Sequence, residues 1–463
     1  MFRRLLLIVL FLAFNENSFA AGNGSVRSLG MGKTGVTHAL GIDSYKNNPA
    51  RLAASWVDLP IQVRFTSLSM VAGNNSMDIG TYNRYFFRDK GDYLTDTQKQ
   101  DLLSSIESES MKFNFTTEAT ILAYAQNNFS IHIQGVGFGE GKVPRGVFEY
   151  ALSGNVNIDD FSIDGTQAEG FGGAEIGFNY GFKLPKTKRM KIFTAGIGVR
   201  HFEGLRYFKV VEATGGIFTA KDVSVFDNTT NYYTSDYPFA EYKHQRNFKT
   251  FASVPSINPN NPNQVSRISV LTSEGGRTLV PIIDIGLYTE IKGAPRTSYG
   301  LTVLNVLGSN VKWNKKAEFK YTEFYTEPNY FDIDSDSVDV EVADSTIATG
   351  GFTSEYPSLV KFGIGKSWDN VTWTFEMEKG LTKNDISFFS AVRYSSGIEY
   401  RLWKQRIPLR FGIILRGVDG VATTWGTGIN TRYFDFDFAY ATHERLALDT
   451  KGISFGFSLT AKI

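Results

Sequence analysis

The sequence contains no cysteine among its 463 residues. This excludes a disulfide framework, a thiolate metal site and an N-terminal lipid anchor on cysteine. It also lacks a long hydrophobic run: after residue 20, no stretch approaches the roughly twenty apolar residues of a membrane helix. Neither sign of charge is in excess, with 48 basic and 47 acidic residues, so the basic stripe of a nucleic-acid-binding protein is not expected.

Glycine and aromatic residues are abundant. The chain has 45 glycines, 38 phenylalanines and 22 tyrosines, and its mean hydropathy is −0.18. Glycine allows strands to bend and pack closely, and aromatic residues gather at the membrane interfaces of β-barrels. A mean hydropathy this low is compatible with a transmembrane barrel, because one face of every strand is polar.

The first twenty residues have the pattern of a signal peptide. Arg3 and Arg4 precede an apolar run from Leu5 to Phe14, and Ser18 and Ala20 are the small residues before the expected cleavage site. The alternative is a buried first helix. An exported chain without membrane helices is periplasmic, secreted or an outer-membrane barrel.

Period-two alternation of apolar and polar residues favours the barrel. In the last segment one face is apolar and the other is small or polar, and the apolar residues are Ile453, Phe455, Phe457, Leu459, Ala461 and Ile463. Because nearly every segment repeats this pattern, a soluble β-sandwich is the less economical alternative. The expected strands are 59–70, 112–125, 128–138, 170–184, 190–204, 281–292, 298–311, 357–368, 370–379, 391–403, 406–417, 421–429, 433–443 and 451–462.

The connectors between these strands alternate in length. Short turns are expected at 126–127, 185–189, 293–296, 369, 404–405 and 430–432, whereas 71–111, 139–169, 205–280, 312–356 and 380–390 are long. Outer-membrane barrels have an even number of strands, short periplasmic turns and long external loops. The sequence therefore predicts about fourteen strands in the outer membrane of a Gram-negative cell, with both termini periplasmic.

Several connectors carry local patterns. Thr95 and Gln98 resemble a capping box, so residues 95–106 are expected to form a helix, and residues 144–152 to form another. Strand-like pieces within 205–280 indicate either two strands that continue beyond the membrane or a separate external hairpin. The acidic residues 331–345 are interpreted as a solvated loop, and a divalent-cation site is the alternative.

If the apolar alternates face lipid, the other face of each strand lines the lumen. Charges of both signs are expected there, and we expect them to pack and pair with one another. These residues are Glu118, His132, Gln134, Glu175, Asn179, Arg200, Asp284, Glu290, Lys361, Glu376, Glu399, Arg401, Arg410, Arg416, Asp435 and Asp437.

No catalytic pattern stands out. The sequence has neither an HExxH zinc motif nor a GxSxG nucleophile elbow, and no cofactor, metal site or catalytic residue is expected. A glycine string at 135–141 resembles a phosphate loop, but no GK[ST] follows it. A barrel strand that bends into an external loop explains it better.

Residues 21–58 precede the first strand and are rich in glycine and small residues. They make neither a good strand nor an amphipathic helix, so we expect them inside the barrel, with a periplasmic tail as the alternative. The phrases Ser28 to Gly32, Gly35-Val36 and Asn48 to Ala53 resemble the N-terminal hatch of the FadL-type barrels. That family includes long-chain fatty-acid transporters and the PorV-like proteins of the type IX secretion system.

The resemblance implies a fourteen-stranded barrel, residues 59–463, with residues 21–58 as a hatch in its lumen. It also assigns Asn48, Pro49 and Ala50 to the hatch, where Pro49 fixes φ and Asn48 bonds nearby backbone. Two functions follow from it. The barrel transports a hydrophobic or amphipathic small molecule, or it binds a secreted protein or surface-attachment machine through its outer loops.

Overall fold

The computed structural model describes most of the chain, with gaps that fall mainly in the outer connectors. The described residues are 24–54, 61–86, 94–106, 109–153, 160–219, 225–226, 232–233, 242–243, 249–250, 255–256, 266–293, 295–313, 318–326, 340–382, 392–417, 420–444 and 449–463. The predicted signal peptide, residues 1–20, lies outside them.

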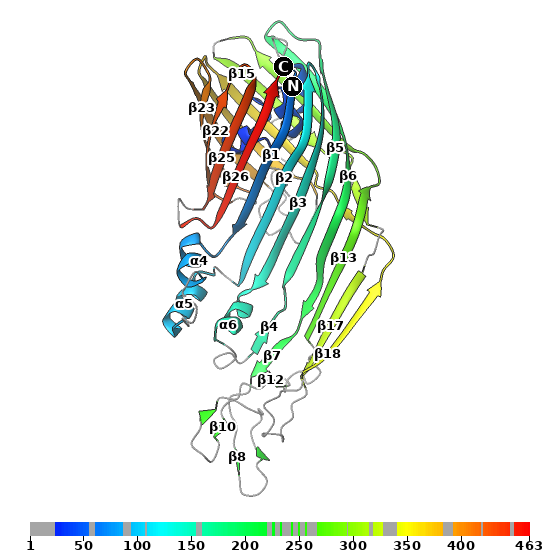
Figure 1. The fold of residues 1–463 in the computed structure, drawn as a ribbon, viewed down its shortest axis with the longest axis vertical. Helices are drawn as coiled ribbons and strands as arrows, with labels where there is room; N and C mark the ends of the chain where they lie inside the picture. The colour runs from blue at the N-terminus through cyan, green and yellow to red at the C-terminus, as the bar shows by residue number, and fades with distance from the viewer. Residues whose placement is uncertain are drawn as a thin grey trace.

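The described strands close into an antiparallel barrel (Figure 1). The ring contains fourteen strands, each paired with the next, and β26 pairs with β1 to close it, which confirms the predicted fold. In ring order these are β1 (Gln62–Asn74), β2 (Ser110–Gln126), β3 (Phe129–Pro144), β5 (Gln167–Lys183), β6 (Met190–Thr214), β14 (Ile282–Ile291), β15 (Arg296–Leu304), β20 (Leu359–Ser367), β21 (Val371–Gly380), β22 (Val392–Leu402), β23 (Ile407–Arg416), β24 (Ala422–Asn430), β25 (Phe434–His443) and β26 (Gly452–Lys462).

Side chains alternate across the wall as the sequence predicted. On β3, Ile131 is 43% exposed on the outer face, whereas the next residue, His132, is 1% exposed and faces the lumen. On β25, Phe436 and Phe438 point outward and Asp437 points inward. An apolar outer face and a polar interior are the pattern of a transmembrane barrel. No described helix has both the length and the hydropathy needed to cross a membrane.

The two ends of the barrel differ. Gln62 pairs with Lys462, so β1 begins and β26 finishes at the end that carries the short turns. The long connectors lie at the other end and include α4 (Ile79–Phe86), α5 (Asp96–Ser104) and α6 (Arg145–Ser153). The capping box at Thr95 is present, and both predicted helices are confirmed.

One side of the barrel extends into a sheet beyond the ring (Figure 1). There β6 pairs with β13 (Ser266–Thr278), β13 with β17 (Glu318–Thr326), and β17 with β18 (Val340–Ala348). Residues 205–214 and 266–278 therefore continue the barrel strands. Between them, residues 225–226 pair with 232–233, and 242–243 pair with 249–250, as two short separate hairpins. The remaining outer strands are β4 (Asp160–Ser162), β7 (Gly216–Thr219), β8 (Val225–Phe226), β9 (Tyr232–Tyr233), β10 (Tyr242–Lys243), β11 (Lys249–Thr250) and β12 (Pro255–Ser256).

Two sequence-based expectations need correction. Residues 340–345 were expected in an acidic loop but belong to β18, whose backbone pairs with β17; residues 331–339 lie outside the described part. The expected strand 298–311 is broken into β15 and β16 (Asn310–Trp313) by a turn at 305–309. Asn305 (φ 52°) and Gly308 (φ 62°) adopt the left-handed conformation there, which both residue types tolerate.

Neighbouring strands are interrupted at the same level. The chain breaks between β13 and β14 at 279–281, and between β19 (Phe352–Glu355) and β20 at 356–358. Proline occurs in both breaks, at 281 and 357, and cannot donate a backbone hydrogen bond.

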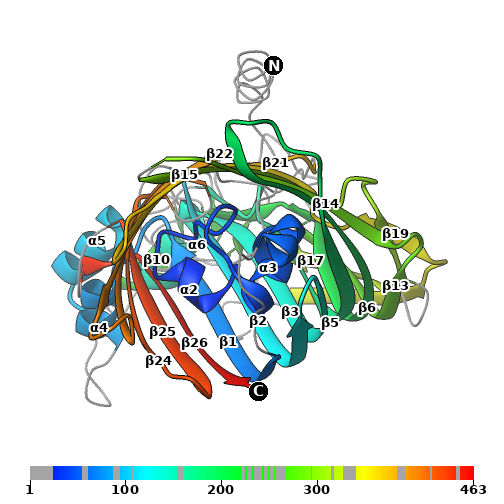
Figure 2. The same cartoon turned by 90° about the horizontal axis from the view of Figure 1, so that it is seen from above.

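Residues 24–54, here called the inner segment, lie inside the barrel near its short-turn end (Figure 2). The segment is mostly irregular. Its short helices are α2 (Val26–Leu29), η1 (Gly41–Asp43), α3 (Ser44–Asn47) and η2 (Pro49–Ala53).

Candidate functional site

Glycines of the barrel wall line the path of the inner segment. A Cβ atom on Gly412 would lie 2.2 Å from the backbone nitrogen of Gly32, and one on Gly196 would lie 2.3 Å from that of Ala50. Other inward glycines that approach the inner segment are Gly181, Gly286, Gly300, Gly363, Gly365, Gly397, Gly426 and Gly456. The wall therefore has glycines, which lack side chains, where the inner segment passes close to it. We call these ten inward glycines the glycine seat.

The Asn48-Pro49-Ala50 turn rests on this seat. The side chain of Asn48 accepts a hydrogen bond from the backbone N–H of Ala50 at 3.0 Å and caps η2, with Pro49 at its first turn. The Asn48 amide also donates to the carbonyls of Val36 and Leu287, both at 3.1 Å. One side chain therefore joins two parts of the inner segment to strand β14.

Polar groups of the wall satisfy the backbone of the inner segment. The carboxylate of Glu376 accepts from the N–H groups of Gly35 (2.7 Å) and Val36 (3.0 Å). Thr424 accepts from the N–H of Gly32 at 2.9 Å. An irregular segment can be buried only if such backbone groups find partners, and here the barrel supplies them.

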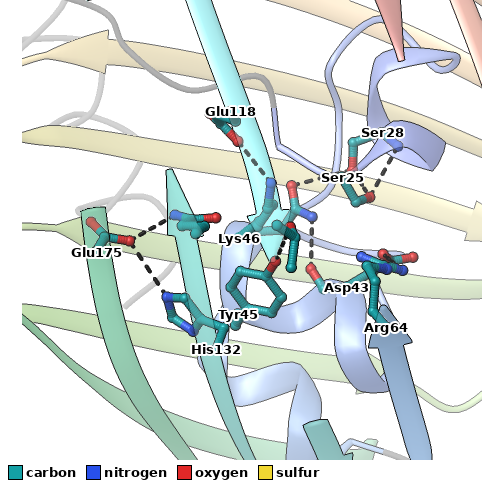
Figure 3. Close-up of polar contacts among 12 residues, drawn as sticks. Ser25, Ser28, Asp43, Tyr45, Lys46, Arg64, Glu118, His132 and Glu175 are labelled. Atoms are coloured by element: carbon teal, nitrogen blue, oxygen red, sulfur yellow. Dashed lines mark hydrogen bonds and ion pairs between the residues drawn. The ribbon is translucent and has the colours of Figure 1, made fainter. Parts of the chain in front are cut away.

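Ion pairs fasten the segment further (Figure 3). Lys46 binds Glu118 of β2 at 2.9 Å, and Asp43 binds Arg64 of β1 at 2.9 Å. Between them, Tyr45 stacks on His132 with ring centroids 4.1 Å apart. These contacts hold η1 against β1, and α3 against β2 and β3.

Glu399 of β22 is shared by three arginines. It accepts two hydrogen bonds from Arg27 of the inner segment, at 2.8 and 2.9 Å. Arg401 (2.7 Å) and Arg410 (2.8 Å) bind the same carboxylate, and Arg410 also binds Asp437 at 2.7 Å. Removing Glu399 would leave three guanidinium groups without this common partner.

A cavity of about 100 Å³ lies in the lumen, bordered by Tyr45 and Lys46 of the inner segment. Glu175 of β5, fully buried, organises its polar side. Glu175 accepts from Gln134 (2.7 Å), Arg200 (2.6 Å) and Tyr356 (2.7 Å), and lies 3.4 Å from Nε2 of His132. Asp284 binds Arg200 from the other side, through oxygens at 2.6 and 2.8 Å.

The other side of this cavity is apolar. Val136, Phe138, Phe171 and Leu359 line it. Phe171 also packs against a buried cluster in the outer part of the lumen, whose members are Phe202, Tyr207, Ile282, Val311, Trp313 and Tyr356. The cavity thus has an apolar wall and a fixed polar wall, which is the composition of a small-molecule site.

The structure brings most of the predicted lumenal residues together in two groups. Glu118, His132, Gln134, Glu175, Arg200, Asp284 and Lys361 surround the cavity. Glu376, Glu399, Arg401, Arg410 and Asp437 lie around the inner segment. Glu290 lies at the short-turn end near Tyr288, Asn179 is buried beside Ser130, and Asp435 pairs with Lys462 at 2.6 Å.

Arg416 departs from the expectation. It lies exposed at the outer end of β23, where its φ of 65° ends the strand. The glycine string 135–141 forms part of β3, and Gly135, Gly137, Gly139 and Gly141 alternate with the inward residues. Tyr45, Tyr356 and Asn305 were not among the expected lumenal residues, because their hydrogen bonds depend on contacts between distant segments.

No protein-family model matches the chain, and no curated protein does so either. Solved structures do. A mutant of the TodX monoaromatic hydrocarbon channel covers 96% of this chain and 100% of its own length, with 12% identity and a TM-score of 0.50. The Ralstonia pickettii toluene transporter TbuX covers 97% and 100%, with 12% identity and a TM-score of 0.47.

At this level of identity the likeness describes the fold alone. The fourteen-stranded ring and the chain-long match to TodX agree with the resemblance seen in the N-terminal sequence. The chain therefore has the fold that the resemblance to FadL-type barrels implied, a closed fourteen-stranded barrel similar to that of TodX.

Proposed function

We propose that this barrel carries a hydrophobic or amphipathic small molecule across the outer membrane, with its short-turn end and both termini in the periplasm. The main support for this proposal is the cavity beside the inner segment. It combines an apolar wall of Val136, Phe138 and Phe171 with the polar network of Glu175 and Arg200. The TodX monoaromatic hydrocarbon channel, whose fold is similar, is a precedent for this assignment.

A groove on the outer face of the wall supports the same function. It has a volume of about 600 Å³. Phe115, Phe208 and glycines of β3 and β5 line one part of it, and the charged residues Arg206, Glu274, Glu318 and Lys320 line another. Gly137, Phe138 and Phe171 border both the inner cavity and this groove. The two spaces share these lining residues, so a solute held in the cavity would lie close to the groove.

Filling the cavity tests the proposal. Thr116 of β2 points into the cavity, and Thr116→Trp places an indole ring where the solute would bind. In intact Gram-negative cells that express the chain, we expect uptake of radiolabelled toluene or oleate to fall by about tenfold, equivalent to about 1.4 kcal/mol of lost binding.

The matched control is Ala119→Trp, three residues along the same strand and on its lipid face, where indole rings are tolerated. We expect uptake to stay at the wild-type level. Purified protein should show the same contrast in toluene and oleate binding. Uptake that is equal in the wild type, in Thr116→Trp and in cells without the protein would reject the transport function.

The projecting sheet favours a second candidate, a binding role for a secreted protein. Among the described residues, β18 pairs with β17 alone, so its other edge offers free backbone groups to an added strand. Deletion of residues 314–349 removes this edge while leaving β15 and β20 in the ring.

The test is copurification from native membranes, followed by mass spectrometry. A protein partner that the wild type retains and the deletion variant loses would support the binding role. If both forms copurify with the same proteins, β18 is not the docking edge.

A further inference from the structure

A second lumenal cavity lies on the short-turn side of the inner segment. Its volume is about 220 Å³, and residues from both the inner segment and the wall line it. The wall residues Arg296, Ser367 and Arg401 stand at strand ends next to the short turns, which places this cavity at the mouth of the barrel. It is separate from the cavity around Glu175.

Positive charge dominates this mouth cavity. Arg27 and Arg51 of the inner segment line it together with Arg296 and Arg401 of the wall, and Glu290 is the one acidic group among its described lining residues. Arg27 and Arg401 share Glu399 with Arg410, so one carboxylate serves three guanidinium groups.

Two of these arginines have no carboxylate partner among the described residues. Arg51 donates from Nε to the carbonyl of Ala39 at 2.8 Å, and its guanidinium lies 4.0 Å from the ring centroid of Tyr288. Arg296 is exposed, and its side chain has no hydrogen-bond or ion-pair partner in the described part of the chain. Arg51 and Arg296 can therefore both bind a negatively charged group.

His38 supplies the second, independent observation. Its side chain lines the mouth cavity and is 6% exposed, yet neither Nδ1 nor Nε2 has a hydrogen-bond partner among the residues that the structure describes. A buried imidazole without partners is costly unless a ligand or ordered molecule satisfies it. Burial and the nearby Arg27 guanidinium lower the pKa of His38, so the ring is neutral and still offers one N–H donor.

We propose that the mouth cavity is a binding site for a small oxyanion, a carboxylate or phosphate group. Planar guanidinium groups bind such anions through paired N–H donors. Thr37 and Ser367 line the same space, and their hydroxyls can add further donors. A bound anion would contact Arg27 and Arg51 on one side and Arg296 and Arg401 on the other, and so would join the inner segment to the wall.

Isothermal titration of the purified full chain tests this, with sodium succinate and inorganic phosphate as probes in detergent. We expect one saturable site and at least about tenfold weaker binding in Arg296→Ala, since a charge-assisted hydrogen bond is lost. Arg296 is exposed, so this variant should fold. His38→Leu should weaken binding as well.

The control is Arg189→Ala, which removes an arginine from another turn at the same end, outside the cavity. It should bind the probes as tightly as the wild type. A thermal scan should show that the probes raise the unfolding temperature of the wild type and of Arg189→Ala more than that of Arg296→Ala.

The source of the anion is decided in lipid nanodiscs. Native mass spectrometry compares phosphatidylglycerol with phosphatidylcholine. Retention of phosphatidylglycerol by the wild type and its loss in Arg296→Ala would assign the site to a lipid headgroup, and binding of succinate or phosphate alone would assign it to a soluble anion. If no probe or lipid binds, or if Arg296→Ala and His38→Leu both bind like the wild type, the site does not exist.

Discussion

Replacing Glu399 by glutamine is expected to loosen the inner segment and to make the barrel conduct ions. Glu399 is 1% exposed and holds Arg27, Arg401 and Arg410 at 2.7 to 2.9 Å. Arg27 is the only one of the three that belongs to the inner segment. Loss of the carboxylate charge leaves the three cations to repel one another in a confined space.

The expected cost is large because the group is buried. Breaking a buried ion pair by removing one partner typically costs about 3–5 kcal/mol, since the remaining charge stays desolvated. The ring itself should survive, because its strand pairing does not use this side chain. The lost free energy should therefore mainly weaken the binding of the inner segment to the barrel wall.

Planar bilayer recordings and limited proteolysis measure the effect. We expect higher open-channel conductance and faster cleavage within residues 24–54 in Glu399→Gln, while the heat-modifiable migration of the folded barrel persists. Glu444→Gln is the control, because Glu444 pairs with Lys451 at 3.6 Å and is largely exposed, a pairing worth little. Equal conductance and cleavage in the two variants would show that Glu399 does not fasten the segment.

The sequence predicted the barrel wall well because the wall follows a local rule. Residues two apart share a face, so a run such as Phe434, Phe436 and Phe438 reveals the outward face of the wall without knowledge of any neighbouring strand. The alternation also placed charged residues such as Glu175 and Glu399 on the inward face, where the structure buries them, but it misplaced Arg416, which is exposed. Only local backbone events escaped it, such as the turn that begins at Asn305 and divides the expected strand 298–311.

The contacts across the lumen could not be predicted in the same way. Arg27 and Glu399 are 372 positions apart, and nothing in the chain near either residue indicates the pairing. The same holds for Tyr356 and Glu175, which are 181 positions apart. Such pairs depend on how the ring closes and how the inner segment crosses it, so they appear only once all strands are in place.

The positions of the glycines in the glycine seat could not be predicted from the high glycine content. The high glycine content indicated a barrel, but not that one inward glycine after another faces the same segment. Gly412, Gly397 and Gly426 lie on adjacent strands and meet residues 30–32. A glycine in the sequence shows only that a side chain is missing. Which segment occupies the space that it leaves can be seen only in the folded structure.

Gly412→Ala is expected to unseat the inner segment by steric overlap. The added methyl group would lie 2.2 Å from the nitrogen of Gly32 and 2.5 Å from the carbonyl carbon of Met31. Both are backbone atoms that cannot rotate away, and Gly32 itself has a φ of 71° that fixes the local path. Overpacking of this kind costs about 1–3 kcal/mol.

Gly139→Ala separates this effect from a general cost of alanine in strands. Gly139 lies on the outer face of β3, where a Cβ atom would meet only the carbonyl oxygen of Glu169 at 3.9 Å. We expect Gly412→Ala to lower the urea midpoint and expose residues 24–54 to protease, and Gly139→Ala to do neither. If both variants resist protease like the wild type, the inner segment adjusts to the methyl group, and the glycine seat does not set its position. Loss of protection in Gly412→Ala alone would show that the wall holds the segment by close backbone approach as well as by charge.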